Sequence, residues 1–135
     1  MKRSTLTLGI FALISVGVTH ADVPPSEPSQ YSQAYNACMD KASSTTSMVE
    51  CIGAEHNAQD AKLNAAYKTL MGALSPDRKK QLREAQRAWI AYRDANCEFY
   101  FDPDGGTIAR LQANQCMLSM TAQRAAELEG FGRLD

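Results

Sequence analysis

The stretch that decides the fold runs from Ser75 to Gly106 and reads SPDRKKQLREAQRAWIAYRDANCEFYFDPDGG. It opens with Ser75, which can cap a helix, followed by Pro76, which suits a first helical turn, and Asp77, which suits the positive end of the helix dipole. Ala, Gln, Arg, Lys and Leu dominate the middle, and these residues favour helix. The end is rich in Asp, Pro and Gly, which break helices. The stretch therefore predicts one long helix, from Pro76 to Tyr100, followed by a tight turn.

The residues on both sides continue this pattern, because Val, Ile and Thr stay sparse from Tyr31 onward. We expect an all-α fold, an antiparallel bundle of three long helices plus a short N-terminal helix and two disulfides. The predicted helices cover Tyr31 to Ala42, Met48 to Leu74, Pro76 to Tyr100 and Thr107 to Glu129, with Gly130 as the last C-cap. Apolar residues recur at three- and four-residue steps, and those expected to face the core are Ile52, Ala61, Leu63, Tyr67, Leu70, Met71, Leu74, Leu82, Ala85, Trp89, Tyr92, Ile108, Leu111, Leu118, Ala122, Ala125 and Leu128.

Four cysteines in so small a chain predict disulfides in an exported protein. They are Cys38, Cys51, Cys97 and Cys116. Three pairings are possible, and we favour the local one, Cys38–Cys51 with Cys97–Cys116. Each of these pairs is centred on a turn, the Ser/Thr run 43–47 or the neighbourhood of Gly105-Gly106, so its members should face each other across a hairpin.

The N-terminus has the features of a secretory signal. Lys2 and Arg3 precede an uncharged, mostly apolar stretch from Leu6 to Val18, and Ala21 offers a small residue for cleavage. That stretch is too short to span a bilayer. We predict a signal peptide over 1–21, a Pro-rich disordered leader over 22–30 and one domain over 31–135, in the periplasm or secreted. A buried N-terminal helix is the alternative.

Charge and composition argue against several classes of function. The chain carries 14 basic and 15 acidic residues, and removal of residues 1–21 would take away two basic ones. A weakly acidic domain is a poor match for nucleic acid. The domain keeps a single histidine, His56, which lies near Glu55 and Asp60 and is expected to be a solvated surface residue. We expect no enzyme activity, no metal site, no cofactor and no membrane span.

Four residues, Gln86, Trp89, Arg93 and Cys97, are spaced to lie along one helix face. The structural interpretation makes Trp89 a core anchor and Arg93 a partly buried cation that needs an acid from another helix. The candidates for that acid are Asp60, Glu50 and Glu127. The functional interpretation makes the same face a binding surface, because Trp and Arg are frequent at interface hot spots.

The turn after this helix is the candidate binding surface for a partner protein. Three consecutive aromatics, starting at Phe99, precede two acids at a loop that the second cysteine pair would brace. Some of the rings should pack inward, and the rest would form a rigid protrusion that loses little entropy on binding. The candidate partner-binding residues are Tyr100, Phe101, Asp102, Asp104, Gly105 and Gly106.

The chain resembles the LprI-type family of lysozyme inhibitors over about residues 34–129. The resemblance rests on Cys38, on Cys51-x8-Asp60-x2-Leu63-Asn64-x2-Tyr67-x2-Leu70, on Leu82-x3-Gln86-x2-Trp89-x3-Arg93-Asp94-x2-Cys97, and on Gly105-Gly106, Cys116 and Thr121-x2-Arg124-x3-Leu128. It implies an exported, disulfide-bonded helical domain that inhibits lysozyme in the cell envelope. We interpret the following motif residues as structural: Asp60, Asn64, Tyr67, Gln86, Trp89, Arg93, Asp94, Thr121 and Arg124.

Three functional hypotheses follow. The first is a binding protein that blocks lysozyme. The second is a periplasmic adaptor or assembly factor that binds another exported protein without inhibiting lysozyme. The third, an enzyme, would require a concave site with perturbed titratable groups.

Overall fold

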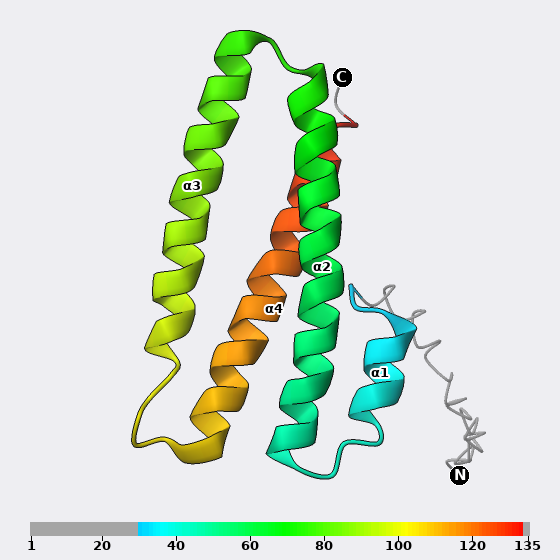
Figure 1. The fold of residues 1–135 in the computed structure, drawn as a ribbon, viewed down its shortest axis with the longest axis vertical. Coiled ribbons are helices and arrows are strands. Elements are labelled where there is room, and N and C mark those ends of the chain that lie inside the picture. Colours follow the sequence, from blue (N-terminus) through cyan, green and yellow to red (C-terminus); the bar gives the residue numbers. More distant parts are fainter. Residues whose placement is uncertain (1–29, 134–135) are drawn as a thin grey trace, which may run out of the picture.

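The computed structural model describes residues 30–133, which form four helices joined by short connections (Figure 1). The helices are α1 (Gln33–Met39), α2 (Thr45–Ala73), α3 (Pro76–Phe99) and α4 (Gly106–Phe131). Successive long helices run antiparallel, and helix is the one regular secondary structure in the described part of the chain. The predicted all-α architecture is confirmed. The predicted signal peptide and nearly all of the predicted leader lie outside the described residues.

The helix ends differ from the predicted ones for local reasons. α2 begins earlier than predicted because the Ser44 hydroxyl accepts the Ser47 N–H at 3.1 Å and the Ser47 side chain returns a bond to Ser44, a capping box. Ser75 occupies the N-cap of α3 but forms no side-chain capping bond, so Pro76 and Asp77 mark that start. α4 runs through Gly130, which was predicted to end it, and Gly132 is its C-cap.

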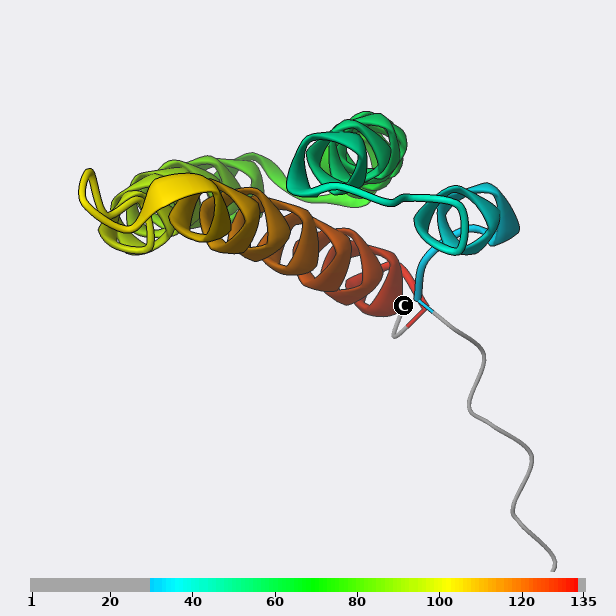
Figure 2. The same cartoon turned by 90° about the horizontal axis from the view of Figure 1, so that it is seen from below.

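α2 and α4 form the most closely packed pair, while α3 packs on α4 and α1 packs on α2. The backbones of α3 and α2 are close at few points, although a short turn joins the two helices. The end-on view shows α4 crossing beneath the space between them (Figure 2). The main core cluster consists of Leu63, Leu70, Leu82, Ala125 and Leu128, with Trp89 packed against it. The bundle is therefore open along one side, between α2 and α3.

Four predictions about the core are wrong. Ala61, Ala85, Tyr92 and Ile108 were expected to face inward, but all four are exposed. The open packing explains Ala85 and Tyr92, because α3 packs closely on α4 alone and a helix with one close neighbour buries a narrower stripe. Ala61 and Ile108 belong to helices with two close neighbours but lie on faces that neither neighbour covers. Tyr92 is 62% exposed because the α3 face that carries it has no helix opposite.

Both predicted disulfides are confirmed. Cys38–Cys51 joins the end of α1 to α2, and Cys97–Cys116 joins α3 to α4 beside the turn that connects them. Disulfides of this kind indicate an oxidising, extracytoplasmic compartment. Within residues 30–133, the helices are all too polar or too short to cross a bilayer.

A buried carboxylate fastens the start of α1 to α2. Glu55 is only 4% exposed, and it accepts the Ser32 hydroxyl at 2.6 Å, the Ser32 N–H at 3.0 Å and the Gln59 side-chain amide at 2.7 Å. Burial alone would raise the pKa of Glu55, but these hydrogen bonds outweigh it and hold the pKa below its usual value. α1 is thus held at one end by a disulfide and at the other by an ionised carboxylate.

Candidate functional site

The segment Phe99–Gly106, called here the aromatic loop, joins α3 to α4 at one end of the bundle. The Cys97–Cys116 disulfide lies at its base, with the two Cα atoms 5.4 Å apart. Cys97 is almost fully buried and Met120 packs its sulfur 3.7 Å from the Cys97 sulfur. The loop therefore projects from a fixed and well-packed base.

Hydrogen bonds and glycines fix the backbone of the loop. The Asp102 carboxylate accepts the Asp104 N–H at 2.9 Å, and the Asp102 carbonyl accepts the Gly105 N–H at 3.1 Å. A Cβ at Gly105 would lie 2.7 Å from the Cβ of Ala109, closer than real Cβ contacts allow. Gly106 has a φ of 63°, a conformation that residues with a side chain rarely adopt. The turn thus requires both glycines.

The loop presents its aromatic rings to solvent. Phe99 is 87% exposed, Tyr100 46% and Phe101 42%. The prediction that some of these rings pack inward is wrong, because each remains more than two-fifths exposed. Asp102 and Asp104 are exposed beside them. Large exposed rings next to carboxylates, on a braced turn, form a surface of the type that proteins use for binding.

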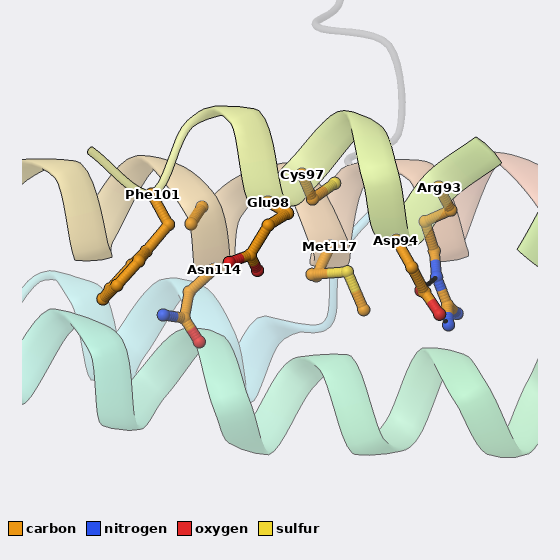
Figure 3. Close-up of a pocket in the computed structure, with 8 residues that line it drawn as sticks. Arg93, Asp94, Cys97, Glu98, Phe101, Asn114 and Met117 are labelled. Carbon is orange, nitrogen blue, oxygen red and sulfur yellow. Dashed lines mark hydrogen bonds and ion pairs between the residues drawn. The ribbon is translucent and has the colours of Figure 1, made fainter. Parts of the chain in front are cut away.

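A pocket of about 410 Å³ lies beside the loop, between α3 and α4. Figure 3 shows its side chains pointing to the same side of the two helices, with Phe101 at one end and Arg93 and Asp94 at the other. Glu98 and Met117 lie between them. We call this the loop pocket. Arg93 and Asp94 in its lining pair with each other, and the remaining charged residue of the lining is Glu98, so the pocket extends the acidic character of the loop.

A second concavity, also about 410 Å³, lies between α2 and α3 on the open side of the bundle and meets the loop pocket at Arg93. We call it the motif groove, because six of the nine residues singled out from the family motif line it. They are Asp60, Asn64, Tyr67, Gln86, Trp89 and Arg93. Of the other three, Asp94 lines the loop pocket, while Thr121 and Arg124 are buried on α4. The structure thus brings most of the motif to one surface.

Trp89 lies in this groove between two arginines. The guanidinium carbon of Arg93 is 5.0 Å from the ring centroid, and that of Arg124 is 5.9 Å away, within reach of a cation–π contact. Trp89 packs against the core but stays partly exposed, so it is both an anchor and a part of the groove surface.

The acid that pairs with Arg93 is not one of those predicted. Arg93 binds the carboxylate of its neighbour Asp94 through two nitrogens, at 2.8 and 2.9 Å, rather than Asp60, Glu50 or Glu127. Glu127 instead accepts Arg124 at 2.6 Å. The Nε of Arg124 donates to Gln86 at 3.0 Å, which ties α4 to α3. Both arginines are thus held in place by local partners.

His56 is partly buried, so its prediction as a solvated surface residue is wrong. Its Nε2 lies 3.2 Å from the Thr121 hydroxyl, which also accepts Arg93 at 3.5 Å. Burial lowers the pKa of His56, and the nearby Arg93 lowers it further, against an opposing effect of Asp60. The neutral ring can therefore accept the Thr121 proton, which links α2, α3 and α4 behind the groove.

Sequence reasoning missed two buried polar residues, Glu55 and Gln59. A signal was present, because Ile52, Glu55, Gln59 and Leu63 follow at helical steps and so share one face. Both polar residues fasten the start of α1, since Gln59 also donates to the Gln30 carbonyl at 3.1 Å.

Within residues 30–133, His, Cys, Asp and Glu do not gather in groups of three that could hold a metal ion.

These features define a class of protein: a small helical domain, braced by two disulfides, that carries an exposed aromatic and acidic loop. Comparison with known families makes this more specific. Residues 38–128 match the family described as lysozyme inhibitor LprI, and the chain belongs to that family.

Two relatives are similar to the chain. An uncharacterized protein of Rhizobium meliloti is 32% identical over 103 residues, which cover 66% of this chain and 74% of the relative. The uncharacterized protein YecT of Escherichia coli is 24% identical over 144 aligned positions, which cover 95% of this chain and 89% of the relative. The chain has no significant match among solved structures.

Proposed function

We propose that this protein is an exported inhibitor that binds lysozyme through the aromatic loop and blocks it in the cell envelope. The family description supplies the target, and one observation carries the binding surface: the exposed rings Phe99, Tyr100 and Phe101 on the loop braced by Cys97–Cys116. Aromatic side chains on a rigid support contribute large contact areas at low entropic cost.

Charge supports the same surface. Lysozymes are often basic, with carboxylates in the sugar-binding cleft. Asp102 and Asp104 on the loop, and Glu98 in the adjacent loop pocket, would attract such a partner and increase its association rate. The aromatic tip would then occupy the mouth of the cleft, while the acidic residues contact its basic surroundings.

A muramidase assay tests this function. The purified, oxidised protein, added at micromolar concentration in ordinary salt to lysozymes of several classes, should inhibit at least one of them. Inhibition should weaken as salt rises, because the acidic residues of the loop contribute through long-range attraction. Unchanged activity of every lysozyme would reject the proposal. Recovery of a different exported protein by the immobilised chain would then favour the adaptor hypothesis.

The location of the protein after export is also part of the proposal. The two disulfides support an oxidising compartment for the folded domain, and the predicted signal peptide over residues 1–21 would deliver it there. We expect it in the periplasm or the medium, where it can meet lysozyme. Fractionation of cells that produce the full chain measures this, and a cytoplasmic, reduced pool would contradict it.

A further inference from the structure

The motif groove differs in charge from the loop that we propose as the lysozyme-binding surface. Arg83 and Arg87 lie one turn apart on its α3 wall, both exposed. Within residues 30–133, neither of them forms an ion pair. Arg93 is already paired with Asp94, and Asp60 is the one acid in the lining. The groove is therefore locally cationic in a chain of net charge −1, and it is a poor surface for a basic partner.

The groove also contains an amide, a carboxylate and two aromatic rings. On α2, the Asn64 amide donates to Asp60 at 2.9 Å, which leaves further donor and acceptor positions of both side chains facing the groove. Tyr67 on the α2 wall and Trp89 on the α3 wall contribute partly exposed aromatic side chains. Aromatic rings of this kind stack on sugar rings, while amides and carboxylates bind sugar hydroxyls.

The backbone limits what else can bind. Both walls are helices, whose N–H and C=O groups are satisfied within each helix, so the groove has no free strand edge for an extended peptide. An amphipathic helix would find apolar side chains here, such as Leu63 and Ile90, but it would also have to bury the charges of Arg83, Arg87 and Asp60. A volume of about 410 Å³ is within the range of small-ligand sites.

We propose that the motif groove binds a carboxylated saccharide. The sugar ring stacks on Tyr67 beside the exposed edge of Trp89, its hydroxyls bond to Asp60 and Asn64, and its carboxylate pairs with Arg83 and Arg87. This site adjoins the loop pocket at Arg93 but has no residue of the aromatic loop in its lining, so it adds to the proposed lysozyme binding and does not depend on it.

Two disaccharides that differ by one lactyl group, which carries a carboxylate, provide the test. The carboxylated probe is N-acetylglucosaminyl-N-acetylmuramic acid, and the neutral probe is N,N′-diacetylchitobiose. Calorimetry and the fluorescence of Trp89, the single tryptophan of the chain, both measure binding. The carboxylated probe should bind with a Kd of about 1 mM or tighter, and the neutral one about tenfold more weakly.

Matched variants identify the groups involved. Arg83→Gln with Arg87→Gln should reduce affinity for the carboxylated probe about tenfold. Lys80→Gln, which removes an exposed charge from α3 outside the groove, should leave it unchanged. Muramidase inhibition should be the same for the wild type, the double variant and Lys80→Gln, which would separate the saccharide site from the aromatic loop.

Three outcomes would overturn the proposal. They are no heat and no fluorescence change with either probe, equal affinity for the two probes, and unchanged affinity in the Arg83→Gln/Arg87→Gln protein. Tighter binding of a short single-stranded DNA than of the carboxylated disaccharide would also overturn it, since it would assign the arginines and Trp89 to a nucleic acid.

Discussion

The two disulfides close turns at the same end of the bundle, yet the regions they hold differ. Beyond Cys38–Cys51, α1 lies against α2, with Ser32 bonded to the buried Glu55. Beyond Cys97–Cys116, the aromatic loop buries little and exposes Phe99, Tyr100 and Phe101. The same covalent device thus secures a structural element in one place and presents a surface in the other.

This difference indicates where binding and stability reside in the molecule. Residues around the first disulfide are tied inward by hydrogen bonds that cross helices, such as Tyr35 to Gln115 at 3.3 Å. At the second, the cross-helix contacts lie at the base, where the Asn96 amide donates to Met120 at 3.4 Å, while the loop itself is fixed through its backbone. Damage near the first disulfide should therefore reduce stability alone, and damage near the second should reduce stability and lysozyme binding together.

Removal of each disulfide gives the largest effect and tests this separation directly. Loops of 13 and 19 residues contribute about 3 kcal/mol each by restricting the unfolded chain. Chemical denaturation of Cys38→Ala/Cys51→Ala and Cys97→Ala/Cys116→Ala should show losses of this size in both. Muramidase inhibition, measured where both variants remain folded, should fall only in the second. An equal loss of inhibition in both variants would contradict the claim that only the second disulfide supports lysozyme binding.

Glu55→Gln should have the next largest effect. All three partners of the Glu55 carboxylate are donors, so an amide would place its own N–H against one of them. The free energy of unfolding should fall by about 2 kcal/mol, whereas Glu50→Gln, exposed on the same helix, should leave it unchanged. Inhibition should be normal in both, and a loss of inhibition in Glu55→Gln would show that α1 contributes to binding.

The same carboxylate makes the protein sensitive to acid. The pKa of Glu55 lies below its usual value of 4.5, so the folded state binds this proton less readily than the unfolded state does. The stability that Glu55 contributes is therefore present above about pH 4.5 and is lost as the pH falls through the folded value. Denaturation across this range should show a shallower decline for Glu55→Gln than for the wild type. Parallel curves would contradict the assignment.

Gly105→Ala should have a smaller effect that is confined to the aromatic loop. The added methyl would overlap Ala109 and crowd Asp102, so the turn must shift, at a cost of about 1–2 kcal/mol. Gly53→Ala is the matched control, because nothing lies near its added methyl and alanine favours a helix interior. The control should be slightly more stable than the wild type. Inhibition by Gly105→Ala equal to that of the control would argue against a fixed loop conformation.

His56 gives the smallest effect. Burial and Arg93 hold its pKa below the usual 6.5, so the unfolded chain takes up this proton first as the pH falls. Stability should decline as the pH drops below about 6.5, and His56→Asn should flatten this part of the curve. If stability depended on pH in the same way in His56→Asn and in the wild type, His56 would be solvated, as its sequence neighbours alone suggest.

The sequence was sufficient for what depends on local spacing. Helix positions followed from periodicity, and the disulfide pairing followed from the two turns between Cys38 and Cys51 and between Cys97 and Cys116. The separation of α3 from α2 could not be predicted, because it depends on how each helix packs against α4. The exposure of Tyr92 and the motif groove both result from that separation.

The candidate site was predicted only in part. The aromatic loop was identified from its composition, but the exposure of its rings depends on the turn geometry at Gly105 and Gly106. The pairing of Arg93 with adjacent Asp94 was missed because helical neighbours point in different directions, and only a long side chain can fold back to reach. The contact of Ser32 with Glu55 spans 23 residues, beyond the range of any periodic pattern.

The most direct test of the central claim is a calorimetric titration of a susceptible lysozyme with wild-type, Phe101→Ala and Tyr92→Ala proteins. Both substitutions remove an exposed aromatic side chain, one from the loop and one from the open face of α3. Phe101→Ala should weaken binding about tenfold or more, while Tyr92→Ala should bind as the wild type does. Equal affinity of the wild type and Phe101→Ala would show that lysozyme does not bind the aromatic loop.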